Sequence, residues 1–232
     1  MADKKTVIIT GANGNLGSAV THAFLGKGYD VIATVAEQSM VKDMPVAEKL
    51  NTVVVDLSKE EEADSFVKNQ IQHYGKIDGA LLLVGGFAMG NIASTPGSDI
   101  KKQISLNFET AYYVVRPLFA HLMEKGSGRI VLIGARPAIN PSQGKDLIAY
   151  GLSKSLLFKL AEFLNEEARG RNVAIAVAAP STLDTPLNRK SMPLVNPDDW
   201  VKPAALAEVL EFIVSDKASI LREPILKVYN NA

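Results

Sequence analysis

Short apolar runs alternate with amphipathic segments along the whole chain. Residues 6–10 form a β-branched, apolar run typical of a buried strand, and residues 18–27 carry apolar side chains at helical spacing before Gly28 ends the segment. The same pattern predicts further strands over residues 31–35, 52–55, 80–84, 129–133, 173–178 and 225–229. It predicts further helices over residues 60–74, 98–125, 149–169 and 203–215.

This alternation indicates the α/β class. Continuous apolar strands separated by helices imply a parallel sheet covered on both faces. No repeat or linker interrupts the pattern, so we expect one doubly wound, Rossmann-type domain over residues 1–232. Ser58, followed by Glu61, predicts a capping box at the start of the helix over 60–74. Residues 180–201 have no clear periodicity, and loops of that length are usually lids or binding loops.

Composition narrows the possible functions. The 232 residues include 25 basic and 25 acidic side chains, so nothing in the charge balance indicates a nucleic-acid or anionic-membrane partner. Cysteine is absent, which excludes disulfides, thiolate zinc sites and a cysteine nucleophile. The three histidines have no second ligand nearby in sequence, so we expect no metal site. We see no signal peptide and no apolar stretch near the ~20 residues that span a bilayer, and therefore expect a cytoplasmic protein.

Three glycines lie in the connection between the first predicted strand and the first predicted helix. Such a turn lets the backbone approach a pyrophosphate and presents the helix N-terminus to it. Three glycines alone are a weak signal, but this position in an alternating chain favours a nicotinamide dinucleotide. The residues of the turn that we assign to the dinucleotide are Gly11, Asn13, Gly14, Asn15, Leu16 and Gly17.

The preference between NADH and NADPH should be decided at the end of the second strand. An acidic residue there would bind the ribose hydroxyls, and an arginine would accept a 2′-phosphate. The sequence has Val35, followed by Glu37, which could reach the ribose or be a solvated loop charge. Asp56, next to Leu57 after the third strand, could bind the adenine or simply form a turn. We therefore expect NADH or NADPH and leave the choice open.

Tyr150 and Lys154 stand four residues apart, which places them on one face of a helix. A nearby cation favours phenolate and would lower the pKa of the tyrosine. A tyrosine tuned in this way can give or take the proton that accompanies hydride transfer. Taken alone, the pair is common and could equally be a helix surface pair.

Together, the glycine turn and the Tyr150/Lys154 pair resemble the short-chain dehydrogenase/reductase family over essentially all 232 residues. The resemblance implies a seven-stranded parallel sheet in the order 3-2-1-4-5-6-7, with Tyr150 as the acid/base and Lys154 on the nicotinamide ribose. It implies that Asn107 completes a proton relay. It also implies a homodimer or homotetramer built through the helices over 98–125 and 149–169. Further dinucleotide contacts are expected from Gly85, Gly86, Pro180, Thr182 and Leu183.

Two positions depart from the family pattern. Gly85-Gly86-Phe87 replaces the usual Asn-Asn-Ala-Gly after the fourth strand, and Ala135 stands where a serine usually binds the substrate carbonyl. Alanine cannot donate a hydrogen bond to a developing oxyanion. Ser142 in the same loop is a possible substitute.

At both positions the sequence resembles the quinonoid dihydropteridine reductases, a subfamily of this family. Residues 182–193 read Thr-Leu-Asp-Thr-Pro-Leu-Asn-Arg-Lys-Ser-Met-Pro, which is very similar to that subfamily's loop after the sixth strand. Its acidic residue at the tip of the second strand is missing, because Val35 occupies that position.

This resemblance implies that hydride and proton add across imine-type nitrogens of a small-molecule pterin, so a serine that polarises a ketone is dispensable. Tyr150 would supply the proton, and Phe87 would pack against the flat pterin or be a core aromatic. Asn188 and Arg189 would face the substrate or order their loop, and Trp200 would pack the lid. The alternatives are a reductase of another carbonyl or alcohol, and a dinucleotide-binding sensor without catalysis.

Overall fold

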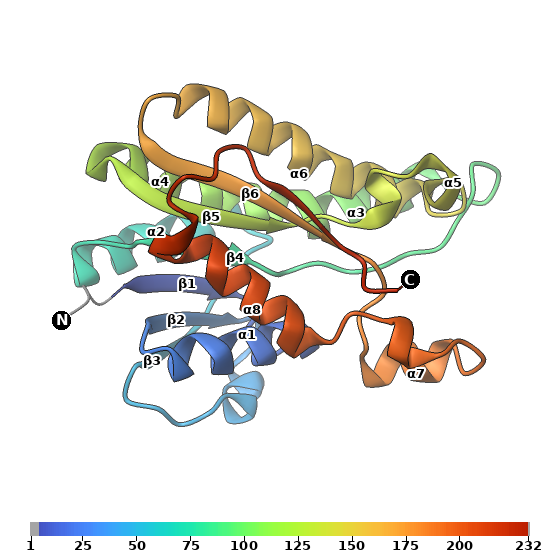
Figure 1. Cartoon of the computed structure of the whole chain (residues 1–232), viewed down its shortest axis with the longest axis horizontal. Helices are drawn as coiled ribbons and strands as arrows, with labels where there is room; N and C mark the ends of the chain where they lie inside the picture. Colours follow the sequence, from blue (N-terminus) through green and yellow to red (C-terminus); the bar gives the residue numbers. More distant parts are fainter. Residues whose placement is uncertain (1–4, 232) are drawn as a thin grey trace.

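A parallel sheet with helices packed against both faces forms the core of the protein in the computed structural model, which describes residues 5–231 (Figure 1). Neighbouring strands follow the order β3-β2-β1-β4-β5-β6-β7, and every pairing is parallel. The predicted fold class and strand order are therefore confirmed. The strands are β1 (Thr6–Thr10), β2 (Asp30–Val35), β3 (Leu50–Val54), β4 (Gly79–Leu82), β5 (Ser127–Ile133), β6 (Asn172–Pro180) and β7 (Ile225–Val228).

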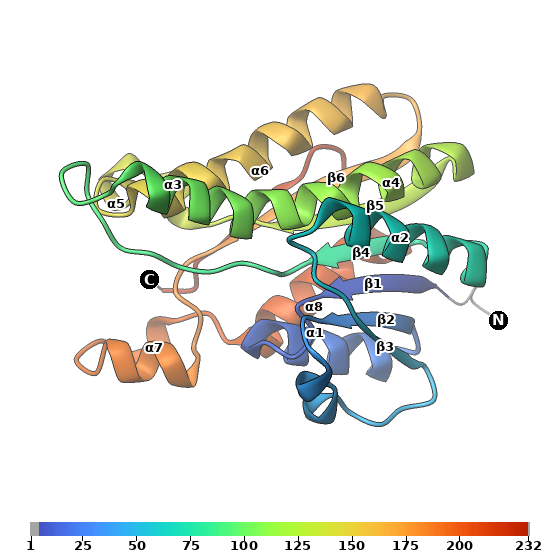
Figure 2. The same cartoon turned by 180° about the vertical axis from the view of Figure 1, so that it is seen from behind.

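Helices form a layer on each side of the sheet. Helices α2 (Glu60–Tyr74), α4 (Thr110–Lys125) and α6 (Ile148–Glu167) bury one apolar face against it, and α1 (Asn15–Gly26) and α8 (Pro203–Val214) bury the other (Figures 1 and 2). Because both faces are covered, all five residues of β1 are buried, and the run is apolar without alternation. The remaining α-helices are α3 (Gly97–Ile104), α5 (Pro141–Gly144) and α7 (Pro186–Ser191), and the short helical turns are η1 (Gln38–Asp43), η2 (Ser105–Glu109), η3 (Arg136–Ala138), η4 (Pro197–Asp199) and η5 (Asp216–Ala218).

The predicted capping box at the start of α2 is wrong. The helix begins at Glu60, and no side chain caps it. Lys59 occupies the N-cap position, one residue after Ser58, and the hydroxyl of Ser58 donates to the carboxylate of Asp56 over 2.6 Å. The three glutamates in the first turn of α2 favour the positive end of the helix dipole.

Two long segments have more structure than the sequence predicts. The helix expected over 98–125 consists of α3 and α4 joined by η2, a π-helical turn of the kind frequently found at functional sites. The loop over 180–201 contains α7 and η4, and a β-bridge between Leu183 and Val201 closes its base. Trp200 is buried at this closure, as predicted for a packing residue.

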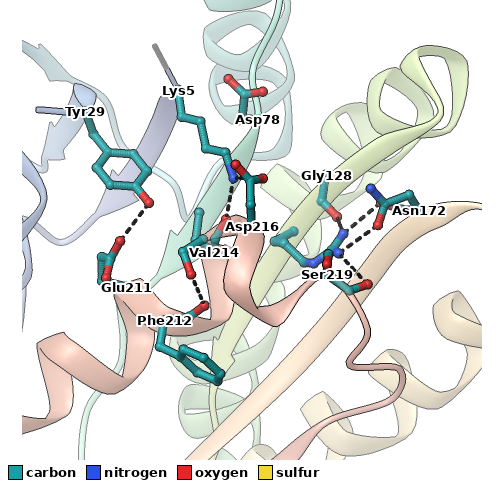
Figure 3. A network of polar contacts seen from close by, with 12 residues as sticks. Lys5, Tyr29, Asp78, Gly128, Asn172, Glu211, Phe212, Val214, Asp216 and Ser219 are labelled. Atoms are coloured by element: carbon teal, nitrogen blue, oxygen red, sulfur yellow. Dashed lines mark hydrogen bonds and ion pairs between the residues drawn. The ribbon is translucent and has the colours of Figure 1, made fainter. Parts of the chain in front are cut away.

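Polar contacts gather at the amino ends of the strands, where they also reach α8 and the segment that follows it (Figure 3). Lys5 binds the carboxylate of Asp216 over 2.7 Å, and the hydroxyl of Tyr29 donates to Glu211 over 2.9 Å. The buried guanidinium of Arg129 binds the side-chain oxygen of Asn172 over 2.7 Å. A polar cleft opens here, but its groups hydrogen-bond one another. Ligands of open parallel sheets bind at the opposite, carboxyl edge. Within residues 5–231, no helix has the length and apolarity needed to cross a membrane.

Candidate functional site

The turn between β1 and α1 has the backbone geometry that its glycines predict. Gly11 has a φ of +62°, a conformation that favours glycine. Gly14 precedes α1, and its amide donates to the carbonyl oxygen of Gly11 over 3.1 Å. Gly17 is buried, and a Cβ on it would overlap with that same carbonyl oxygen. The third glycine is therefore needed for the close packing of α1 against the turn.

The first turn of α1 is suited to an anion. No side chain caps the helix, and its first turn contains no acidic residue. Its free amide groups and the positive end of the dipole are therefore available to a phosphate. Asn13, Gly14, Asn15 and Leu16 are all exposed or half-buried around these amides. The turn thus fits the pyrophosphate of a dinucleotide.

The end of β2 lies beside this turn, because the amide of Ala12 donates to the carbonyl oxygen of Thr34 over 3.0 Å, and β3 is the next strand outward. Val35 is buried, so its side chain belongs to the core, while the neighbouring Glu37 is exposed. Asp56 accepts hydrogen bonds from the hydroxyl and amide of Ser58, which lower the pKa of its carboxyl group. Asp56 therefore forms a turn, with Leu57 buried behind it, and its contact with an adenine stays a prediction.

Tyr150 and Lys154 lie in the first two turns of α6, and burial dominates the protonation of both. The buried Lys154 ammonium donates to the carbonyl oxygen of Ile133 over 2.8 Å, and burial lowers the pKa of Lys154 to about 8. Burial raises the pKa of Tyr150 to about 12. The pKa of Tyr150 is therefore shifted in the opposite direction from the one expected beside Lys154, because burial disfavours the charged phenolate. Tyr150 is therefore protonated at neutral pH.

Asn107 lies in the π-helical turn and holds the loop after β4. Its side-chain oxygen accepts the amide of Gly86 over 2.8 Å, and its nitrogen lies 3.1 Å from the carbonyl oxygen of Gly86. The same nitrogen lies 2.8 Å from Gln103 Oε1 and 3.1 Å from Ser153 Oγ. The Asn107 side chain thus positions the Gly85–Gly86 backbone, whereas its part in a proton relay stays a prediction.

Gly85 is in the middle of this arrangement. A Cβ on Gly85 would lie 2.6 Å from Asn107 Oδ1 and 3.1 Å from Lys154 Nζ. Only glycine therefore lets the loop approach both polar groups. Gln103 and Ser153 were not predicted as site residues. Their positions could have indicated them, because Gln103 is four residues before Asn107 on the same helical face and Ser153 directly precedes Lys154.

Phe87 is at the surface, beside the proposed acid. Its side chain is 62% exposed, and its ring lies edge-on to that of Tyr150, with centroids 5.1 Å apart. The alternative that Phe87 is a core aromatic is therefore wrong. Ala135 follows β5 and is only 3% exposed. Ser142 is in α5, where its hydroxyl donates to Asn140 over 2.8 Å.

The loop over 180–201 is stabilised by its own polar residues. Asn188 donates to the carbonyl oxygen of Leu183 over 2.9 Å, and Arg189 forms two contacts, of 2.6 and 2.9 Å, with Asp184. Of the two roles considered for Asn188 and Arg189, the ordering of the loop is the one observed. Pro180 is buried at the end of β6, and the carbonyl oxygen of Thr182 accepts the amide of Val201.

The structure thus brings Tyr150, Lys154, Asn107, Gly85 and Phe87 together at the carboxyl edge of the sheet. The glycine turn lies at the same edge, since a Cβ on Gly11 would lie 3.2 Å from the side chain of Val84, in the loop after β4. In the part of the chain that the structure describes, no three acidic or histidine side chains are grouped to hold a metal ion.

Comparison with known proteins agrees with this geometry. The model of the short chain dehydrogenase family matches residues 5–194. A dihydropteridine reductase of Dictyostelium discoideum is 30% identical, and the alignment covers 89% of this chain and 86% of the relative. An acetoacetyl-CoA reductase of an Acinetobacter species is 25% identical over 98% of this chain and 97% of its own. The solved structure of ElxO with NADP bound has a TM-score of 0.90, with 20% identity and 97% of both chains covered.

Proposed function

The chain belongs to the short chain dehydrogenase family, and from that membership we propose that it reduces quinonoid dihydropterins with NADH or NADPH. The observation that carries the proposal is the position after β5, where Ala135 replaces a hydroxyl while the exposed Phe87 lies against Tyr150. A ketone reductase needs a donor for the oxyanion that develops, and alanine has none. The Dictyostelium relative, named a dihydropteridine reductase, supports the same substrate class.

The dinucleotide, when bound, supplies the hydride. Tyr150 is protonated at neutral pH and donates a proton to a ring nitrogen of the acceptor. Lys154 would hold the nicotinamide ribose, and Phe87 would cover one side of the flat heterocycle. Contacts from Gly85, Gly86, Pro180, Thr182 and Leu183 complete the proposed dinucleotide site. Val35 is buried and has no polar group for a ribose hydroxyl or a 2′-phosphate, so the proposal includes both NADH and NADPH.

Steady-state turnover tests this proposal. The protein is assayed with quinonoid dihydropterin and, side by side, with a panel of small ketones, using each dinucleotide in turn. We expect the pterin to be reduced with the higher kcat/KM. Protein that binds a dinucleotide but reduces no pterin with either one would contradict the proposal.

Carbonyl reduction is the second candidate, because the Acinetobacter relative is named an acetoacetyl-CoA reductase. It requires a hydroxyl in place of the missing serine, and Ser142 is the candidate in that loop. The Ser142 hydroxyl is already bound to Asn140 in α5. Faster reduction of ketones than of pterin, lost in Ser142→Ala, would favour this candidate.

We also propose that the chain forms a homodimer or homotetramer through α4 and α6. The outer faces of these helices expose large apolar side chains, namely Tyr112, Leu152, Leu156 and Phe163. Phe163 is 66% exposed, and such a patch is typical of an interface. Sedimentation should show a species above the mass of one 24.9 kDa chain, and Phe163→Asp should shift it toward the monomer. A wild-type monomer at all concentrations would refute the interface.

A further inference from the structure

Arg136 is a cation at the proposed active site without an anionic partner. It directly follows Ala135 and begins η3 at the carboxyl edge of the sheet. The residue is half-buried, and its guanidinium carbon lies 4.7 Å from the centroid of the Tyr229 ring. Among residues 5–231, its guanidinium has no carboxylate within ion-pair distance and no hydrogen-bond acceptor. A guanidinium without a partner in the protein has its hydrogen-bond donors free for a ligand.

The chain beyond β7 holds Tyr229 in place. Its carbonyl oxygen accepts a hydrogen bond from the hydroxyl of Ser181 over 2.8 Å. The side chain of Asn230 donates to the carbonyl oxygens of Trp200 and Asp198, over 3.1 and 2.9 Å. Tyr229 and Asn230 are therefore hydrogen-bonded to both ends of the loop over 180–201. Because an aromatic face rather than an acid holds Arg136, the guanidinium is oriented without being neutralised.

The segment carrying Arg136 packs against the start of α6. A Cβ on Gly151 would lie 3.6 Å from the carbonyl oxygen of Pro137, and Gly151 is the neighbour of Tyr150. Figure 1 shows α5, the adjoining end of α6 and the C-terminal end of the chain at this same edge. Arg136 thus lies between Ala135 and a residue whose backbone contacts the neighbour of the proposed proton donor.

We propose that Arg136, oriented by Tyr229, forms a subsite for the carbonyl-bearing edge of the substrate's heterocycle. This inference rests on the proposed pterin reduction. When a hydride from the dinucleotide adds to one ring nitrogen, the electron pair of that C=N bond is delocalised through the conjugated ring, and Tyr150 gives its proton to a second ring nitrogen, which restores a neutral ring. Negative charge builds transiently on the ring carbonyl that is conjugated with the accepting nitrogen. Arg136 donates hydrogen bonds to that oxygen and keeps all of its protons.

This subsite explains how a site with Ala135 can select its acceptor. A serine hydroxyl stabilises the single oxygen of any ketone, whereas a planar guanidinium matches a planar, oxygen-bearing edge. Arg136 is thus a specificity-determining residue that favours conjugated heterocycles over simple ketones.

The test uses Arg136→Gln and Arg136→Lys, with Arg222→Gln as the matched control. Arg222 is exposed before β7, where it binds the carbonyl oxygens of Ser219 and Leu221. Each variant is assayed for kcat and KM with quinonoid dihydropterin and with a neutral ketone, and for dinucleotide affinity by fluorescence. We expect Arg136→Gln to lower kcat/KM for the pterin by about ten- to a hundredfold, the contribution of a charge-assisted hydrogen bond. The kcat/KM for the ketone and the dinucleotide affinity should each change less than about twofold. The midpoint of thermal unfolding should change by less than a few degrees.

Arg136→Lys keeps the charge but not the planar fork, and should give an intermediate kcat/KM. Tyr229→Leu removes the aromatic face and should raise KM for the pterin more than it lowers kcat. Wild-type kcat/KM for the pterin in a folded Arg136→Gln or Arg136→Lys variant would overturn the inference. Failure of the proposed function is distinguishable from failure of this inference, because the wild-type protein would then reduce no pterin at all.

Discussion

The ring of Phe87 lies edge-on to the ring of Tyr150, with the centroids 5.1 Å apart and the planes inclined by 68°. Phe87 lies in the loop after β4 and Tyr150 lies in α6, so residues distant in sequence form one aromatic pair. Phe87 remains largely exposed within it. An exposed aromatic beside a proton donor is a suitable surface for a flat substrate.

Phe87→Ala should raise KM for quinonoid dihydropterin by about three- to tenfold, because an aromatic contact contributes about 0.5–1.5 kcal/mol. Stability should hardly change, since the side chain is exposed. Phe87→Trp should retain a low KM. Phe212→Ala on α8, also exposed, is the control, and an equal effect there would contradict a specific role.

Tyr150→Phe should lower kcat for pterin reduction by about a hundred- to ten-thousandfold while preserving dinucleotide affinity, because it removes the proton donor. Tyr74→Phe, at the end of α2, is the matched control and should turn over normally. Unaltered turnover in Tyr150→Phe would show that another group donates the proton. A wild-type protein that binds the dinucleotide but catalyses nothing would instead support a sensor.

Gly17→Ala should weaken dinucleotide binding and lower the midpoint of thermal unfolding, because the added methyl group would overlap with the backbone of Gly11 and Ala12. Gly26→Ala, at the end of the same helix, meets no atom within 4 Å. That control should leave binding unchanged and stabilise the protein by about 0.4–1 kcal/mol. Equal behaviour of the two variants in calorimetry and titration would argue against the proposed packing.

Stability should fall as the pH is lowered below about 6.5, the usual pKa of histidine. Nε2 of His121 accepts the amide of Ile77 over 3.2 Å, and burial lowers the pKa of His121. Below pH 6.5 the unfolded chain therefore takes up a proton that the folded protein does not, and the free energy of unfolding decreases. For one group the slope cannot exceed about 1.4 kcal/mol per pH unit.

Urea unfolding between pH 5 and 7.5 measures this dependence. His121→Gln should flatten the pH profile, whatever its effect on stability at pH 7.5. His73→Gln replaces an exposed histidine and should retain the wild-type profile. An unchanged slope in His121→Gln would assign the acid sensitivity to other groups.

Ala135→Ser should raise kcat/KM for small ketones by about tenfold or more, because a donor at this position stabilises a developing oxyanion. Pterin reduction should be affected much less. Ala135→Gly is the size control and should not acquire ketone activity. A ketone rate that stays at the wild-type level in a folded Ala135→Ser protein would contradict the role assigned to this position.

Local patterns were sufficient for the α/β class and for several elements, whereas the strand order was expected only from the family resemblance. Residues 6–10 and 60–74 were predicted with the boundaries observed for β1 and α2, because a fully apolar run and an amphipathic period are properties of neighbouring residues. The capping box failed at the same helix. Ser58 lies one residue too early to cap the helix, and only the folded turn shows that Lys59 is the N-cap and that Ser58 binds Asp56.

The sequence by itself determined the α/β class, the glycine turn and the Tyr150/Lys154 pair, since each depends on residue types at short, regular spacing. The tertiary structure decided what surrounds them. Only folding places Phe87 on Tyr150, Arg136 on Tyr229 and Lys154 against Ile133. It also decided the protonation of the pair, because pKa values depend on burial and on neighbours brought together by the fold.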